Sequence, residues 1–205
     1  MTFKTLTLAA ALAAVSTPSA IAFAQASDPG AATVESFDAA LLDAMKQAKS
    51  LGVSGRYQKL DPAVQQAFDL PTMTRFAVGP PWATVAPADQ AALIKAFTRL
   101  SVATYAHNFD GYSGERFTME PKVETRGPDK LVRSHIVSPH DKPVDLTYRM
   151  RQAADGRWKI IDVYYNGSVS ELAARRSDFA ASMANGGAPA LIKKINALAD
   201  KLVKT

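Results

Sequence analysis

The spacing of apolar residues changes near the middle of the chain and changes back near its end, and this pattern constrains the fold more than any other feature of the sequence. Up to Gly111, apolar residues recur at steps of three or four, as on one face of a helix. Beyond Gly111 they alternate with polar residues, as in half-buried strands, until helical spacing returns after residue 168. Helices, then strands, then helices predict a single α+β domain in which helices pack on one face of an antiparallel sheet.

Four helical segments are expected before the strands. A polar linker of small residues, 25–32, precedes them, and the sequence Gly79-Pro80-Pro81 interrupts them. The longest segment carries an apolar stripe with Leu93, Phe97 and Leu100, which must cover another part of the protein. The segments are a helix that Thr33 caps and Gly52 and Gly55 end, two short pieces at 61–68 and 72–78, and a helix from Pro87 to about Asn108.

Four strands are expected in an antiparallel meander, because four alternating runs follow one another with turn sequences between them. The fourth run is apolar on both faces, with Trp158 and Ile160 on one side and Ile161 and Val163 on the other. Since an antiparallel sheet usually has one wet face, either helices cover both faces or an apolar pocket lies between sheet and helices. The runs are the segment around Phe117 and Met119, and residues 131–137, 144–150 and 158–165.

Two further helices are expected after the strands. Ser168 and Glu171 have the spacing of a capping box, which predicts that Ser168 caps the first of them. The sequence Asn185-Gly186-Gly187 is expected to stop this helix, and Pro189 to begin the next.

The first residues have the pattern of a cleaved signal peptide. Lys4 precedes an apolar run at 6–15 that is too short for a stable membrane anchor, and Ala22-Phe23-Ala24 has the form that a signal peptidase accepts. An uncleaved membrane anchor is the alternative. We therefore expect an exported protein with a signal peptide at 1–24, a linker at 25–32 and one domain at 33–205.

Charge and cysteine content exclude several classes of function. The 24 basic and 19 acidic residues give a formal net charge of +5. Because the basic residues are scattered and form no run, no nucleic-acid partner is expected. The chain has no cysteine, so an exported form cannot rely on disulfides, and thiolate metal sites and cysteine nucleophiles are excluded.

No group of side chains has the spacing of a catalytic or metal site. His135, His140 and Asp141 match no standard zinc motif. The segment from Gly111 to Glu115 is similar to a serine-hydrolase elbow, but Glu115 stands where that motif requires glycine, and the segment leads from helix into strand. We therefore expect no catalytic residues, no metal and no cofactor.

Three stretches of the chain resemble the MlaC family, also called the toluene-tolerance family. They are FDLPTMTRFAVGPPW (68–82), PADQAALIKAFTRLSVATYAHNFDGYSGERF (87–117) and DLTYRMRQAADGRWKIIDV (145–163). Within and after them, the residues at positions that the family favours are Tyr148, Trp158, Asp162, Gly167, Ser170, Arg176 and Phe179. The resemblance spans about residues 34–195, which is most of the chain after the expected signal peptide.

One departure points to a branch of this family. The family commonly places a serine two residues after the glycine that precedes the last helical region, whereas Gly167 and Ser170 are three apart in NGSVS (166–170). This spacing, together with ARRSDFA and NGGAPALI, resembles the branch associated with hopanoid biosynthesis. A second departure is Ala86 before Pro87, where the family often has threonine.

The resemblance implies a soluble periplasmic carrier that holds lipid tails between a twisted sheet and helices. It implies exchange of lipid with an ABC-transporter complex in the inner membrane and with an outer-membrane lipoprotein partner. The cargo would be a phospholipid or a hopanoid-type lipid. The candidate lining residues are Phe76, Leu93, Phe97, Leu100, Val132, Ile136, Leu146, Tyr148, Ile160 and Leu172; each also suits an ordinary core.

Two other functions remain open at this point. One is an adaptor that binds transporter components without cargo. The other is an enzyme on a similar scaffold that acts on an apolar terpenoid, for which Asp162 with Tyr148 or His135 is the pair to consider. Alternation places Asp162 on the face of Trp158 and Ile160, where an unpaired carboxylate would be costly to bury.

Overall fold

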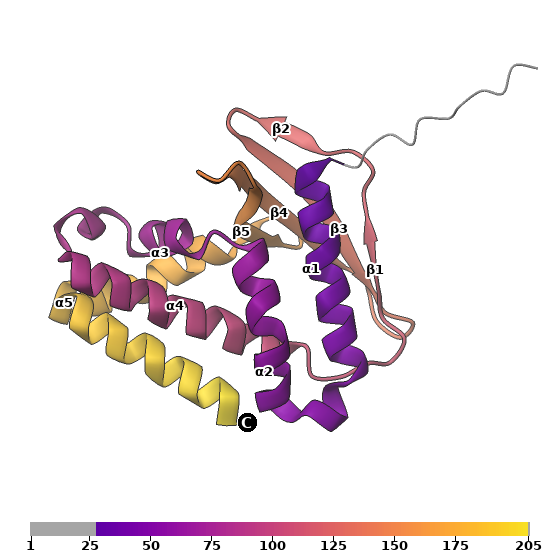
Figure 1. Cartoon of the computed structure of the whole chain (residues 1–205), viewed down its shortest axis with the longest axis horizontal. Coiled ribbons are helices and arrows are strands. Elements are labelled where there is room, and N and C mark those ends of the chain that lie inside the picture. Colours follow the sequence, from indigo (N-terminus) through magenta and orange to yellow (C-terminus); the bar gives the residue numbers. More distant parts are fainter. Residues whose placement is uncertain (1–27, 205) are drawn as a thin grey trace, which may run out of the picture.

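Helices cover one face of an antiparallel sheet, as the change of period predicts (Figure 1). The computed structural model describes residues 28–204, so the expected signal peptide at 1–24 lies outside the described residues. The helices are α1 (Pro29–Lys46), α2 (Ala48–Ala67), α3 (Leu70–Val78), the 3₁₀ helix η1 (Pro80–Thr84), α4 (Pro87–Asn108) and α5 (Glu171–Lys204). The strands are β1 (Arg116–Met119), β2 (Glu124–Arg126), β3 (Asp129–Val137), β4 (Val144–Gln152), β5 (Trp158–Tyr165) and β6 (Val169–Ser170).

The sheet has six strands in place of the predicted four. Its order is β1-β3-β4-β5-β6, and β2 pairs with β3 outside this path. The nine-residue β3 pairs along one part with β2, where Glu124 lies opposite Leu131, and along another part with β1, where Phe117 lies opposite Ile136. The prediction missed β2 and β6 because runs of three and two residues are too short to display alternation.

A bulge in β5 explains why the four successive residues 160–163 are all buried. Met150 pairs with Ile160 but Arg149 pairs with Asp162, so Ile161 is an extra residue and the alternation inverts there. Val163 therefore shares the helix-covered face with Ile160. The predicted position of Asp162 was wrong, because the bulge turns it to the opposite face.

The first helix begins earlier than predicted. The Asp28 carboxylate accepts hydrogen bonds from Gly30 N at 2.8 Å and Ala31 N at 3.4 Å, and Pro29 occupies the first turn, where its missing N–H costs nothing. The end of the predicted linker at 25–32 is thus helix. As predicted, a helical segment ends at Gly52, whose φ of 58° and ψ of −178° are not helical. A second segment of α2 follows this bend and includes most of the short piece predicted at 61–68.

The helix α4 has the predicted bounds, whereas the cap of the last helix was misplaced by two residues. Ser170, and not Ser168, precedes α5, and its Oγ accepts a hydrogen bond from Ala173 N at 3.0 Å. Ser170 Oγ also donates to Asp162, whose carboxylate accepts from Leu172 N as well. As predicted, a helical segment ends at Gly187, whose φ of 60° and ψ of −157° are not helical, and Pro189 lies at the start of the second segment of α5, which reaches Lys204.

Replacing Ser170 by Ala is therefore expected to lower the free energy of unfolding by about 1 kcal/mol, because the first turn of α5 loses its cap. Ser168→Ala is the matched control and is expected to change it by less than about 0.5 kcal/mol, since Ser168 is exposed. Urea unfolding of the two variants measures both values. A larger loss in Ser168→Ala would show that the capping box predicted from the sequence is the correct one.

The core lies between the sheet and the helices and contains a cluster of aromatic rings. The Phe37 ring meets Phe68 and Tyr105 edge-to-face, with centroid distances of 5.0 and 5.1 Å. Such contacts add to the gain from burying the rings themselves. Within residues 28–204, no helix is both long and apolar enough to cross a membrane.

Candidate functional site

Nine of the ten candidate lining residues lie in one apolar cluster between the sheet and the helices. Seven of them are buried and two, Ile136 and Leu172, are half-buried against the cluster. The tenth, Phe76, is half-buried elsewhere, beside the guanidinium groups of Arg75 and Arg151. The structure thus brings the predicted residues together, but as packed side chains.

An open groove of about 650 Å³ runs between α1 and α2. We call it the α1–α2 groove. Figure 1 shows the two helices side by side over the sheet. The groove exists because small side chains face each other across it, namely Ala32, Ser36 and Ala40 from α1 and Ala63 and Ala67 from α2. None of the ten candidate residues lines this groove.

The Phe37 ring separates this groove from the core. It lines the groove, yet only 1% of its surface is exposed, because the ring packs against Phe68 and Tyr105. Phe68 and Tyr105 also line a small, partly open cavity with Phe97 and Leu172, and the polar side chains of Glu171 and Arg175 border it. Its volume of about 10 Å³ is at the lower limit for holding one water molecule.

Basic side chains lie at one end of the α1–α2 groove. Arg157 and Trp158 line this end, and the Lys130 amine lies 4.3 Å from the centre of the Trp158 ring. Lys130 also pairs with Asp28 at 2.5 Å, and Arg157 pairs with Asp155 at 2.6 Å. The Arg157 pair is well exposed, and such pairs contribute little to stability, so its carboxylate can be exchanged for another anion at small cost.

A buried polar group joins α1 to the sheet. Only 3% of the Asp38 surface is exposed, and its carboxylate accepts hydrogen bonds from Ser134 Oγ at 2.7 Å and from Tyr148 OH at 3.1 Å. Burial raises the pKa of Asp38 to about 6, although the two hydrogen bonds act in the opposite direction. The sequence prediction missed Asp38, although it lies on the apolar stripe of α1, four residues after Val34.

Neither pair considered for catalysis is assembled, because Asp162 bonds to neither Tyr148 nor His135, and His135 lies between Asp145 and Glu120. The bulge in β5 turns Asp162 away from the face of Tyr148, and Tyr148 is bonded to Asp38 instead. The Asp162 carboxylate accepts from Val163 N, Ser170 Oγ and Leu172 N, so its contacts hold the start of α5 in place. Within residues 28–204, no three histidine or acidic side chains are grouped in a way that could hold a metal ion.

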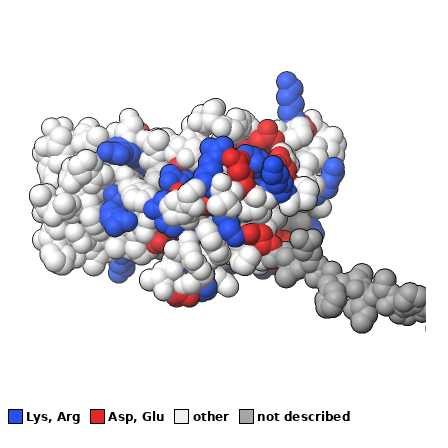
Figure 2. Space-filling model, turned by 90° about the horizontal axis from the view of Figure 1, so that it is seen from above, with Lys and Arg blue, Asp and Glu red and all other residues white. Residues whose placement is uncertain are grey.

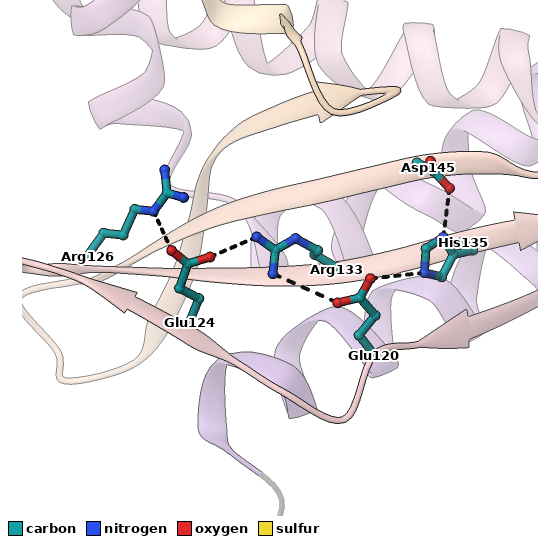
Figure 3. A network of polar contacts seen from close by, with 6 residues as sticks. All are labelled: Glu120, Glu124, Arg126, Arg133, His135 and Asp145. Atoms are coloured by element: carbon teal, nitrogen blue, oxygen red, sulfur yellow. Dashed lines mark hydrogen bonds and ion pairs between the residues drawn. The ribbon is translucent and has the colours of Figure 1, made fainter.

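The outer face of the sheet carries a network of opposite charges that also includes His135 (Figure 3). Glu124 binds Arg126 and Arg133, Glu120 approaches Arg133 and His135, and His135 Nδ1 lies 2.8 Å from Asp145. Figure 2 shows basic and acidic side chains next to one another on the face that it presents. Pairing of opposite charges is typical of a solvated face.

Asp129 holds two arginines on the same outer face. Arg149 and Arg151 both bind its carboxylate, at 2.5 and 2.6 Å. Burial alone would raise the pKa of Asp129, but the hydrogen bonds and charges of Arg151 and Arg149 hold it below its ordinary value. The outer face is therefore stabilised by its own ion pairs, and helices cover only the opposite face.

Comparisons with known proteins agree with this architecture. A solved structure of a phospholipid-binding protein from Ralstonia solanacearum, in complex with a phospholipid, superimposes with a TM-score of 0.73. The two sequences are 22% identical, and the match covers 84% of this chain and 98% of the other. No match was found among curated proteins. The sequence profile of the family described as MlaC protein matches residues 35–197, so this chain belongs to the MlaC family.

Proposed function

We propose that this protein is a periplasmic carrier that binds the acyl chains of a lipid and moves the lipid through the aqueous space between two membranes. The observation that carries the proposal is the α1–α2 groove, which a single buried ring, Phe37, separates from an apolar core. Membership of the MlaC family and the likeness to a phospholipid-binding protein support it. No catalytic step is part of this function.

The energetics explain why such a protein needs no specific chemistry. A two-chain lipid has more than about twenty methylene groups, and shielding each from water is worth about 0.8 kcal/mol. A carrier therefore needs an apolar space and a way into it, while contacts to the headgroup only adjust specificity. The nine clustered candidate residues would line that space once a chain has entered, and Leu172 and Phe97 already border the small cavity.

The location and partners are proposed on the same basis. The signal peptide at 1–24 would direct export, and the carrier would then exchange lipid with an inner-membrane transporter complex and an outer-membrane lipoprotein. The NGSVS segment at 166–170 favours the hopanoid-associated branch, so a hopanoid-type lipid is proposed beside phospholipid as cargo.

Native mass spectrometry of the mature protein, purified from periplasm, tests the proposal. A one-to-one adduct is expected, and extraction of the protein should release a lipid with a phospholipid or hopanoid mass. An unliganded mass that stays unchanged after incubation with lipid vesicles would contradict the carrier function. That outcome would favour the second candidate, a transporter adaptor without cargo, which the close packing of the core supports.

A further inference from the structure

We propose that an acyl chain of an anionic phospholipid enters this protein through the α1–α2 groove, displaces the Phe37 ring, and leaves the lipid phosphate beside Arg157 and Lys130. This inference rests on the proposed carrier function and identifies the entry site and the side chain that closes it. It depends on the lining of the groove, on the contacts that hold α1, and on the charges at one end.

The groove has the size and lining that an acyl chain requires. Its volume of about 650 Å³ lies within the range of roughly 300–1,000 Å³ typical of small-molecule sites. Alanines from both helices form much of its walls, so an apolar chain finds apolar surface without steric obstruction. At its base lies Phe37, and behind Phe37 lie two rings that border the core cavity. Movement of this one side chain would extend the groove to the Phe68 and Tyr105 rings of the core.

Along the groove, α1 is bonded to the sheet and not to α2. Along residues 29–40, the polar side-chain contacts that α1 makes with other described elements all go to the sheet: Thr33 Oγ donates to Trp158 O at 3.0 Å, and Asp38 binds Ser134 and Tyr148. The ion pair between α1 and α2, Asp43 with Lys59, lies beyond this stretch, nearer the turn.

The bend in α2 lies at Gly52, before Pro62, the first residue of α2 that lines the groove. Gly52 has φ of 58° and ψ of −178°, and no atom lies within 4 Å of the position that a Cβ would occupy there. The backbone at this point is therefore uncrowded, and glycine adopts these dihedral angles more readily than any other residue. The half of α2 that lines the groove is held at its end, where Asp69 N donates to Ile160 O at 2.9 Å, so the acyl chain enters by displacing the Phe37 ring and not by separating the two helices.

The charges identify the lipid class and its orientation. Arg157 lines the groove and Lys130 lies against Trp158 at the same end, so two cations surround the place where a headgroup would leave the groove. A lipid phosphate can replace the exposed Asp155 as the partner of Arg157, because guanidinium groups bind phosphate with two parallel hydrogen bonds.

Filling the groove tests the entry site. Ala40→Trp places an indole in the groove, and Ala39→Trp places one on the preceding residue of α1, beside Phe117 and outside the groove. Lipid uptake from phosphatidylglycerol vesicles is measured by native mass spectrometry over time. The rate is expected to fall at least tenfold in Ala40→Trp and to stay within twofold of wild type in Ala39→Trp.

A second variant provides the same test if the Ala40→Trp protein does not fold. Ser36 also lines the groove and is exposed, so Ser36→Trp fills it from a position that tolerates a large side chain. Uptake at the wild-type rate in a folded Ser36→Trp or Ala40→Trp protein overturns the entry site. Absence of uptake in the wild-type protein would instead contradict the carrier function itself, so the two failures are distinguishable.

The headgroup position has its own test. Arg157→Gln is expected to lower uptake from phosphatidylglycerol vesicles at least threefold, and to leave uptake from phosphatidylcholine vesicles less affected. Arg126→Gln is the matched control, because Arg126 is similarly exposed and similarly paired, but lies on the outer face of the sheet. Equal uptake by Arg157→Gln and Arg126→Gln would overturn the placement of the phosphate.

Discussion

Asp38→Asn is expected to raise the free energy of unfolding by about 3 kcal/mol at pH 7, although it removes a charge that accepts two hydrogen bonds. The pKa of Asp38 is raised from 3.8 to about 6 in the folded protein, because burial disfavours the charged carboxylate. Each pKa unit corresponds to about 1.4 kcal/mol, so the ionised form weakens the fold by about 3 kcal/mol. An asparagine side chain keeps the shape and stays neutral.

The stability difference between Asp38→Asn and wild type is expected to depend on pH. Because the folded pKa is raised, the contribution of Asp38 to stability is fully present below pH 4 and is lost as the pH rises towards 6. The advantage of Asp38→Asn over wild type should therefore grow from about 1 kcal/mol at pH 4.5 to about 3 kcal/mol at pH 7. Urea unfolding of both proteins across this range measures it.

The exposed Asp110 supplies a matched control for Asp38. Asp110→Asn is expected to differ from wild type by less than about 0.5 kcal/mol at both pH values. If wild type and Asp38→Asn instead show parallel stability curves between pH 4.5 and 7, the carboxylate is hydrated in the folded protein, and α1 does not pack against the sheet as the structure has it.

The long elements were predictable because their sequences carry many repeats of one period. The stripe through Leu93, Phe97 and Leu100 placed α4 at its observed bounds, and the alternation in 131–137 and 144–150 placed two paired strands. The bulge at Ile161 was not predictable, since a single extra residue in an apolar run leaves the composition unchanged. The cap at Ser170 was missed because two serines compete for it in one segment.

The candidate site was predictable only in part, for a related reason. Large apolar residues such as Leu93, Tyr148 and Ile160 are easily recognised, and the structure collects them where they fill space. A groove, in contrast, depends on small residues that face one another, such as Ala40 and Ala63. Alanines on a helix carry no distinctive signal, so the position of an open space follows from how α1 and α2 are placed, and not from either sequence alone.

Phe37→Ala is expected to cost about 3–5 kcal/mol of unfolding free energy, the range measured when a buried aromatic ring is removed from a core. The ring is almost fully buried and contacts both Phe68 and Tyr105 edge-to-face, so its loss leaves a cavity that joins the groove to the interior. Phe76→Ala is the control: that ring is half-buried outside the apolar cluster, and its loss should cost about 1 kcal/mol.

A second substitution at Phe37 distinguishes a role in closing the groove from a role in core packing. Phe37→Leu keeps an apolar side chain, should cost less than about 2 kcal/mol, and therefore leaves a folded protein to assay. If Phe37 closes the core, this smaller side chain should speed lipid uptake from vesicles severalfold, although the fold is less stable. Urea unfolding and timed native mass spectrometry give the two values. A Phe37→Leu protein with reduced stability and unchanged uptake would make Phe37 an ordinary core residue, because loosening a closing side chain must accelerate entry.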